Sequence, residues 1–107
     1  VGAVLEANSI PGISEEVRAL IAQKCIPGGS LDNLAFANNF VEWDGVPDSL
    51  RILLADAQTS GGLLLCVPPR HLEKVRRILK RHRTPAAEVI GRIERARPPR
   101  IQVTSKC

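Results

Sequence analysis

Aromatic side chains are scarce in this chain of 107 residues, which contains two Phe, one Trp and no Tyr. All three aromatics (Phe36, Phe40 and Trp43) precede residue 70, whereas most of the basic residues follow it. Proteins that bind single-stranded nucleic acid stack the bases on aromatic rings inside a basic groove. The basic part of this chain offers no such rings, and the sequence has no zinc-finger or RNA-recognition motif. We therefore do not expect nucleic acid as a partner.

The chain also lacks a long hydrophobic run and a regular cysteine pattern. No apolar stretch approaches the roughly 20 residues of a transmembrane helix, and the opening residues do not form a signal peptide. Cys25, Cys66 and Cys107 are too far apart for the Cys-x-x-Cys spacing of metal and redox sites. An odd number of cysteines without a framework is typical of a reducing compartment. We expect a cytoplasmic protein with no membrane contact, in which Cys25 and Cys66 are buried and Cys107 is exposed.

The length is typical of a single domain, so we expect residues 1–107 to form one domain. The chain does not begin with Met, and we interpret it as a piece of a larger protein. Its charge is uneven. Residues 1–69 carry eight acidic and three basic side chains, whereas residues 70–107 carry three acidic and twelve basic ones. Such a basic region indicates either a solvated helix face or a surface for a polyanion or an acidic partner, and we favour the solvated face.

The most informative segment is residues 56–65, which read Asp-Ala-Gln-Thr-Ser-Gly-Gly-Leu-Leu-Leu. Polar residues and a Gly61-Gly62 pair precede a continuous apolar run that ends at Pro68. A run of this kind between chain breakers predicts a strand that is buried on both faces. Exposed backbone N–H groups at the mouth of such a strand can bind an anion. The alternative is a tight turn that only leads into a core strand.

The other elements follow from apolar spacing, helix caps and breakers. We expect a strand over residues 2–7, a helix from Ser14 to Cys25, a weaker helix from Ser30 to Phe36, a short helix from Pro47 to Leu54, a helix over residues 70–83, a strand over residues 87–96 and an edge strand with Ile101 and Val103. Strands interleaved with helices in unequal blocks predict the α+β class, with helices packed on a small mixed β-sheet.

Four stretches resemble the selenophosphate synthetase (selenide, water dikinase) family. Residues 56–64 are similar to its Asp-(Pro/Ala)-Gln-Thr-Ser-Gly-Gly-Leu-Leu signature, and residues 27–33 are similar to its Gly-Gly-Thr-x-x-Asn turn. Residues 41–43 and 89–93 resemble two further segments in the same order. The resemblance implies the C-terminal domain of the AIR-synthase-like superfamily, with α/β/α layers. It therefore identifies this chain as a truncated C-terminal domain of a larger two-domain enzyme.

The resemblance further implies an activity, namely the conversion of ATP, selenide and water to selenophosphate, AMP and phosphate, with magnesium, by a homodimer. The family's catalytic Cys or selenocysteine, its essential Lys and most of its metal-binding aspartates lie in an N-terminal half that nothing here matches. We therefore assign no catalytic and no metal-binding residue to this chain. We expect it to bind neither ATP nor magnesium alone, and to be inactive without the missing N-terminal ATP-binding half.

Eight residues from the two most family-like stretches are candidates for a place in the cleft between the domains, near the nucleotide. They combine permissive backbone with side chains that form hydrogen bonds, and they are Gly28, Gly29, Asn33, Gln58, Thr59, Ser60, Gly61 and Gly62. The alternative is that the glycines only let helices pack closely on the sheet.

Two other functions remain open from the sequence. One is a non-catalytic binding module, whose basic face over residues 70–106 would bind tRNA or an acidic selenium-delivery partner. The other rests on a second resemblance, to the hydrogenase-maturation carbamoyl dehydratase, which carries its cargo on a C-terminal Cys after Pro-Arg-Ile. This chain has Pro99-Arg100-Ile101 and ends in Cys107, but five residues intervene. The Gln-Thr-Ser-Gly-Gly stretch argues against this reading.

Overall fold

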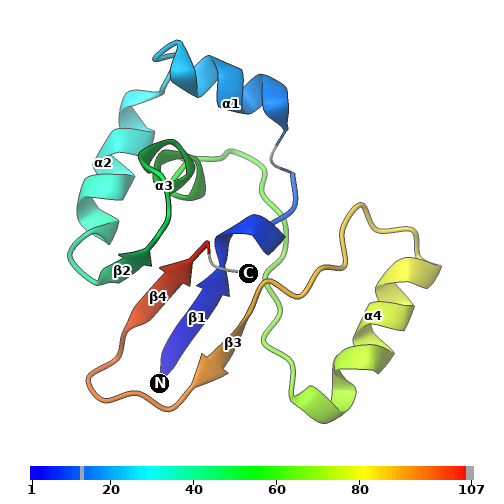
Figure 1. The fold of residues 1–107 in the computed structure, drawn as a ribbon. Coiled ribbons are helices and arrows are strands. Elements are labelled where there is room, and N and C mark those ends of the chain that lie inside the picture. Colours follow the sequence, from blue (N-terminus) through cyan, green and yellow to red (C-terminus); the bar gives the residue numbers. More distant parts are fainter. Residues whose placement is uncertain (13, 106–107) are drawn as a thin grey trace.

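The computed structural model describes residues 1–12 and 14–105, which contain a four-stranded mixed sheet in the order β2-β4-β1-β3 (Figure 1). Strand β4 runs parallel to both of its neighbours, whereas β3 is antiparallel to β1. The strands are β1 (Gly2–Glu6), β2 (Val41–Asp44), β3 (Gly91–Glu94) and β4 (Ile101–Thr104). The α+β class and the mixed sheet are confirmed.

The α-helices lie in two places around this sheet. Figure 1 shows α1, α2 and α3 together near the end toward which β1 and β4 point, while α4 lies beyond β3. The helices are α1 (Glu15–Ala22), α2 (Gly28–Ala37), α3 (Asp48–Leu54) and α4 (Leu72–Arg81), and two short 3-10 helices are η1 (Ala7–Ser9) and η2 (Pro69–His71). No helix in the described part of the chain is long and apolar enough to cross a membrane.

Helix α1 begins at the predicted cap. The Ser14 Oγ accepts a hydrogen bond from the Val17 backbone N–H at 3.4 Å, which satisfies one of the helix's unpaired donors. Glu15 and Glu16 occupy the first turn, where a negative charge interacts favourably with the helix dipole. Two hydrogen bonds lower the pKa of the Glu16 carboxyl below its ordinary value of 4.5. The larger effect comes from the Ser14 side chain, and the smaller one comes from the backbone N–H of Glu16 itself.

Helices α1 and α4 are both followed by a non-glycine residue in the left-handed conformation, which was not predicted from the sequence. Lys24 follows α1 with φ of 60°, and Arg83 follows α4 with φ of 53°. The residue after each accordingly donates back into the helix, Cys25 N–H to Leu20 O at 3.0 Å and Thr84 N–H to Leu79 O at 3.1 Å. This left-handed ending is usually built with Gly, so nothing in the sequence marked it. Helix α1 therefore ends at Ala22, before the expected Cys25.

The core lies where α3 meets the sheet. Leu50 and Val46 are buried against Ala7 and Val103, and half-buried side chains surround them, namely Leu5, Val41, Trp43, Leu53, Leu54 and Ile101. The strand register aligns Val103 with Leu5 on one side and with Trp43 on the other. One row of the sheet thus supplies the floor of the core, and the apolar spacing of α3 supplies its cover.

The expected strand over residues 63–67 is wrong, because these residues form no strand in the structure. The segment has no regular secondary structure, and Leu63 and Leu64 are 85% and 69% exposed. The central position between β1 and β2 is taken by β4, which was expected at an edge. An apolar run forms a strand only if a neighbouring strand is free to pair with it. In this sheet the position between the parallel strands β1 and β2 is occupied by Ile101–Thr104.

Smaller corrections concern boundaries and cysteines. Residues 41–44, to which no secondary structure was assigned, form the edge strand β2, and α2 begins at Gly28 directly after Pro27 rather than at Ser30. The expected strand over residues 87–96 is limited to Gly91–Glu94. Cys25 and Cys66 are exposed, so the expectation that both are buried is wrong. Cys107 lies outside the described residues.

Candidate functional site

The two family-like stretches meet in space. The first two turns of α2 lie against residues 55–57, which follow α3. The Asn33 side chain donates from Nδ2 to the Ala55 backbone oxygen at 3.1 Å. A Cβ built on Gly29 would lie 3.5 Å from the Ala57 Cβ, which is ordinary contact. Gly29 and Asn33 of the first stretch therefore lie beside the residues that begin the second.

Ser30 and Asp56 form the centre of this contact, although neither was among the eight candidates. The Ser30 hydroxyl donates to Asp56 Oδ1 at 2.5 Å, and the Ser30 residue is fully buried. A hydrogen bond to a carboxylate is stronger than one between neutral groups, so it ties the start of α2 to the segment after α3. Two sequence signals were present: a small hydroxyl directly after a Gly-Gly pair, and an acid that opens the Asp-Ala-Gln-Thr-Ser run.

The remaining candidates lie outside this contact. Gln58, Thr59, Ser60, Gly61 and Gly62 are all exposed and form an irregular segment that continues from Asp56. A Cβ on Gly61 would meet only the Gln58 Oε1, at 3.4 Å, and one on Gly28 or Gly62 would meet nothing within 4 Å. The described glycines with positive φ are Gly12 and Gly45. Close packing of a helix on the sheet therefore does not explain Gly61 and Gly62 in the described part of the chain.

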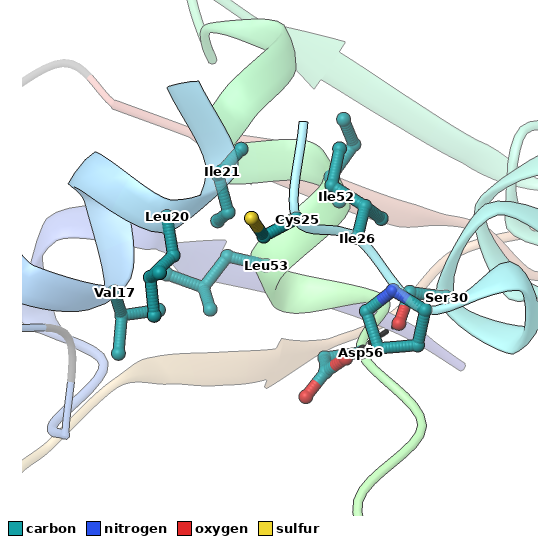
Figure 2. A pocket seen from close by; sticks show the side chains of 10 residues that line it. Val17, Leu20, Ile21, Cys25, Ile26, Ser30, Ile52, Leu53 and Asp56 are labelled. Atoms are coloured by element: carbon teal, nitrogen blue, oxygen red, sulfur yellow. Dashed lines mark hydrogen bonds between the residues drawn. The ribbon is translucent and has the colours of Figure 1, made fainter. Parts of the chain in front are cut away.

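A cavity of about 170 Å³ opens beside the Ser30–Asp56 hydrogen bond. Figure 2 shows it between α1, the segment before α2, and α3, with the Cys25 thiol between Ile21 and Leu53. Its lining is apolar apart from Cys25, Ser30 and Asp56, and comprises Val17, Leu20, Ile21, Cys25, Ile26, Pro27, Ser30, Ile52, Leu53 and Asp56. None of the eight candidates lines this cavity.

The cavity beside Ser30 and Asp56 lacks the charges of a nucleotide site. The cavity lining contains no Lys or Arg, which are the groups that clamp phosphates. Among residues 1–12 and 14–105, no three His, Cys, Asp or Glu side chains lie together as a possible metal site. The cations are concentrated on α4, where Lys74, Arg77 and Lys80 are exposed and Arg76 pairs with Glu73 at 3.1 Å. The residues that line the cavity do not by themselves fit magnesium-ATP.

The arrangement is instead that of a supported, exposed segment. Asp56 accepts a hydrogen bond from Ser30 of α2, and residues 58–62 present two hydroxyls, an amide and two glycines to solvent. Peptide N–H groups at two consecutive glycines are unobstructed by side chains and can approach a ligand closely. This segment can add hydrogen bonds to a site whose charged groups come from elsewhere.

Comparison with known proteins agrees with the motifs. The family model described as AIR synthase related protein, C-terminal domain, matches residues 1–104. A selenide, water dikinase from Myxococcus xanthus (strain DK1622) is 39% identical over 97 residues, which are 90% of this chain and 27% of the relative. Proteins with the same name from Porphyromonas gingivalis (strain W83) and Cronobacter sakazakii (strain ATCC BAA-894) are 38% and 37% identical, over 81% and 88% of this chain.

The match is to one part of these proteins. The similarity to each of the latter two covers 25% of its length, so the chain spans about a quarter of the curated relatives that it matches. Within that part the match is nearly complete, since the family model extends over residues 1–104 of 107. The chain therefore belongs to the family of AIR synthase related proteins, in which it corresponds to the C-terminal domain.

Proposed function

We propose that this chain is the C-terminal domain of a selenide, water dikinase, the enzyme that makes selenophosphate, AMP and phosphate from ATP, selenide and water. The three relatives described above carry that name and match 81% to 90% of the chain, which supports the proposal. The structural observation that carries it is the exposed segment Gln58–Gly62, which follows closely after Asp56, the acceptor of the Ser30 hydrogen bond.

In this proposal the chain contributes shape and hydrogen bonds rather than catalytic groups. Gln58, Thr59, Ser60 and the N–H groups of Gly61 and Gly62 would face the cleft between this domain and the ATP-binding half. Gly28, Gly29 and Asn33 would support the same wall from α2. When bound, ATP with magnesium supplies the phosphoryl group. We assign its binding mainly to the other half, because the cavity beside Ser30 and Asp56 has no Lys or Arg and no three possible metal ligands lie together among the described residues.

The assembly and the compartment are further parts of the proposal. The partner of this domain would be the N-terminal ATP-binding half, within a homodimer. We place the protein in the cytoplasm, which agrees with two free and exposed cysteines, Cys25 and Cys66, in the described part of the chain.

Phosphorus NMR tests the activity directly. Magnesium-ATP and selenide are mixed with the 107-residue chain or with the longer protein that contains it, and selenophosphate and AMP are followed over time. We expect both products from the longer protein and neither from the 107-residue chain. Absence of selenophosphate from both would refute the proposed function.

Gly61→Val in the longer protein tests the role of the exposed segment. We expect a loss of turnover on the order of tenfold to a hundredfold, because a branched side chain would displace groups that position the substrate. The matched control is Ala19→Val, which adds bulk of a similar size at an exposed position on α1. Equal turnover in both variants would limit Gly61 to a structural role.

A further inference from the structure

Helix α4 has two different sides. On one side Leu72, Val75 and Leu79 are half-buried, and Arg76 donates from Nε to the Ala87 backbone oxygen at 3.4 Å. This side therefore faces the chain that follows the helix. Figure 1 shows α4 beyond β3, apart from α1, α2 and α3, so the opposite side of the helix is accessible to a partner.

The accessible side carries three cations, Lys74, Arg77 and Arg81, which form a cationic stripe. Their spacing of three and four residues places them on one face of the helix, and all three are exposed. The single acid of α4, Glu73, pairs with Arg76 at 3.1 Å, and no side chain of the stripe forms an ion pair with another described residue. Like charges at this spacing repel each other, so the stripe lacks the negative charges that would offset its repulsion.

Ile78 adds an apolar group to the same side. It lies four residues after Lys74 and three before Arg81, and it is 47% exposed. Apolar contacts surrounded by polar groups are typical of protein interfaces. A phosphate backbone offers negative charge but no apolar side chain, and the chain has no aromatic residue after Trp43 on which bases could stack. A helix that lies in a membrane surface buries a whole apolar face, which one exposed Ile does not provide.

We propose that the cationic stripe binds an acidic segment of another protein. Carboxylates of the partner pair with Lys74, Arg77 and Arg81, and an apolar side chain of the partner covers Ile78. Charge complementarity favours this occupant, since the three cations follow one another over about 10 Å, or two helical turns. Unlike a face that is only solvated, this surface combines uncompensated charge with an exposed apolar side chain.

A second copy of this chain does not match the stripe. Among the other described helices, α1 has two neighbouring acids in its first turn, Glu15 and Glu16, and α2 and α3 have one acid each, Asp32 and Asp48. None of these helices therefore presents carboxylates over two turns. The partner is accordingly a different protein, and its binding requires no selenophosphate chemistry, so the two proposals are independent.

Fluorescence anisotropy tests the stripe in the longer protein that contains this chain, at about 0.15 M salt. The probe is a labelled peptide in which Glu residues flank a central Leu, and a matched peptide has Gln in place of Glu. We expect the Glu peptide to bind, and Arg77→Gln/Arg81→Gln to weaken its binding at least about tenfold. The control Arg95→Gln/Arg97→Gln removes the same charge at two exposed positions outside α4, and it should change binding less than about twofold.

Ile78→Ala tests the apolar contact and keeps a good helix former in α4. We expect about fivefold weaker binding of the Glu peptide, because the apolar area that the partner covers becomes smaller. The matched control is Ile93→Ala on β3, where Ile93 is 55% exposed, and it should bind as the unchanged protein does.

The proposal would be overturned if the Glu peptide did not bind, if the Gln peptide bound equally well, or if both pairs of Arg changes weakened binding equally. Unchanged binding of Ile78→Ala, or tighter binding of an RNA duplex than of the Glu peptide, would replace the protein partner by a phosphate polyanion. Tighter binding to phosphatidylserine vesicles would replace it by a membrane. Self-association of the longer protein that Arg77→Gln/Arg81→Gln abolishes would identify a second copy instead. None of these measurements needs activity, so their outcomes are distinguishable from the phosphorus NMR result.

Discussion

Two leucine-rich segments about ten residues apart differ in how far their side chains are exposed to solvent. In α3, Leu50 is 4% exposed and Leu53 and Leu54 are half-buried around it. In the segment after α3, Leu63 is 85% exposed and Leu64 is 69% exposed. Both segments are strongly apolar, so hydrophobicity alone does not explain the difference.

The spacing of the leucines and the availability of partners explain it. In α3 the spacing of three and four residues places the apolar side chains on one face, and a single surface, the sheet, is enough to bury them. Three consecutive leucines in an extended chain point alternately to opposite sides and need a cover on each. The described part of the chain supplies the first arrangement but not the second, so Leu63 and Leu64 remain exposed.

The largest expected effect comes from removing the buried leucine. Leu50→Ala should destabilise the 107-residue chain by about 2 to 5 kcal/mol, because it leaves a cavity between Ala7, Val46 and Val103. Urea denaturation followed by circular dichroism measures the change. A loss below about 0.5 kcal/mol, the usual range for surface positions, would contradict the core described here.

The second effect concerns the hydrogen bond that joins the two regions. Ser30→Ala should lower stability by about 1 to 3 kcal/mol, because it removes a buried donor to the Asp56 carboxylate. In a double-mutant cycle with Asp56→Asn, the two changes should be non-additive. Asp32→Asn serves as the control, since Asp32 is exposed on the same helix. Additive effects would show that the two side chains do not interact in solution.

A smaller effect is expected at the start of α1, where Ser14→Ala should cost about 1 kcal/mol of stability. The pKa of Glu16 is lower in the folded chain than in the unfolded chain. The stability that ionised Glu16 contributes is therefore fully present above its pKa in the unfolded chain, near 4.5. This stability is lost as the pH falls through the pKa of Glu16 in the folded chain. The difference between wild type and Ser14→Ala should narrow over that acidic range. NMR titration of Glu16 should show a higher pKa in the variant.

The smallest effect is expected at Leu64. In the 107-residue chain, Leu64→Ala should change stability by no more than about 0.5 kcal/mol, because the side chain is already in solvent. Cys66 should react with a thiol reagent under native conditions, as an exposed cysteine does. If Cys66 did not react with the thiol reagent and Leu64→Ala lost much stability, residues 63–67 would be buried. The difference in exposure between this segment and α3 would then not exist.

Local signals in the sequence located the helices well. The Ser14 cap, the break at Pro47 and the apolar spacing of residues 72–79 each correspond to a helix in the structure, whereas α2 begins two residues before the expected Ser30. Strand assignments were weaker, because β-pairing depends on neighbours that are distant in sequence. Residues 41–44 pair with residues 101–104, and nothing local to either segment predicts that partner.

In the candidate site, too, local motifs were recognised in the sequence, whereas contacts between distant residues were not. The motifs brought attention to residues 27–33 and 56–62, and the structure places Gly29 and Asn33 against Ala55 and Ala57. The residue pair that holds the two stretches together, Ser30 and Asp56, was missed because a hydrogen bond across 26 residues has no local signature. Whether Gln58–Gly62 lines a cleft stays a prediction.

The sequence by itself determined the α+β class, the family, the uneven charge and the N-terminal cap of α1, because each depends on composition, on a motif or on contacts within one turn. Only the tertiary structure decided which apolar segment occupies the centre of the sheet. Ile101–Thr104 took that place and Leu63–Val67 did not, although the latter is the more hydrophobic. The physical reason is that burial requires a matching surface, and such a surface is formed only when distant parts of the chain come together.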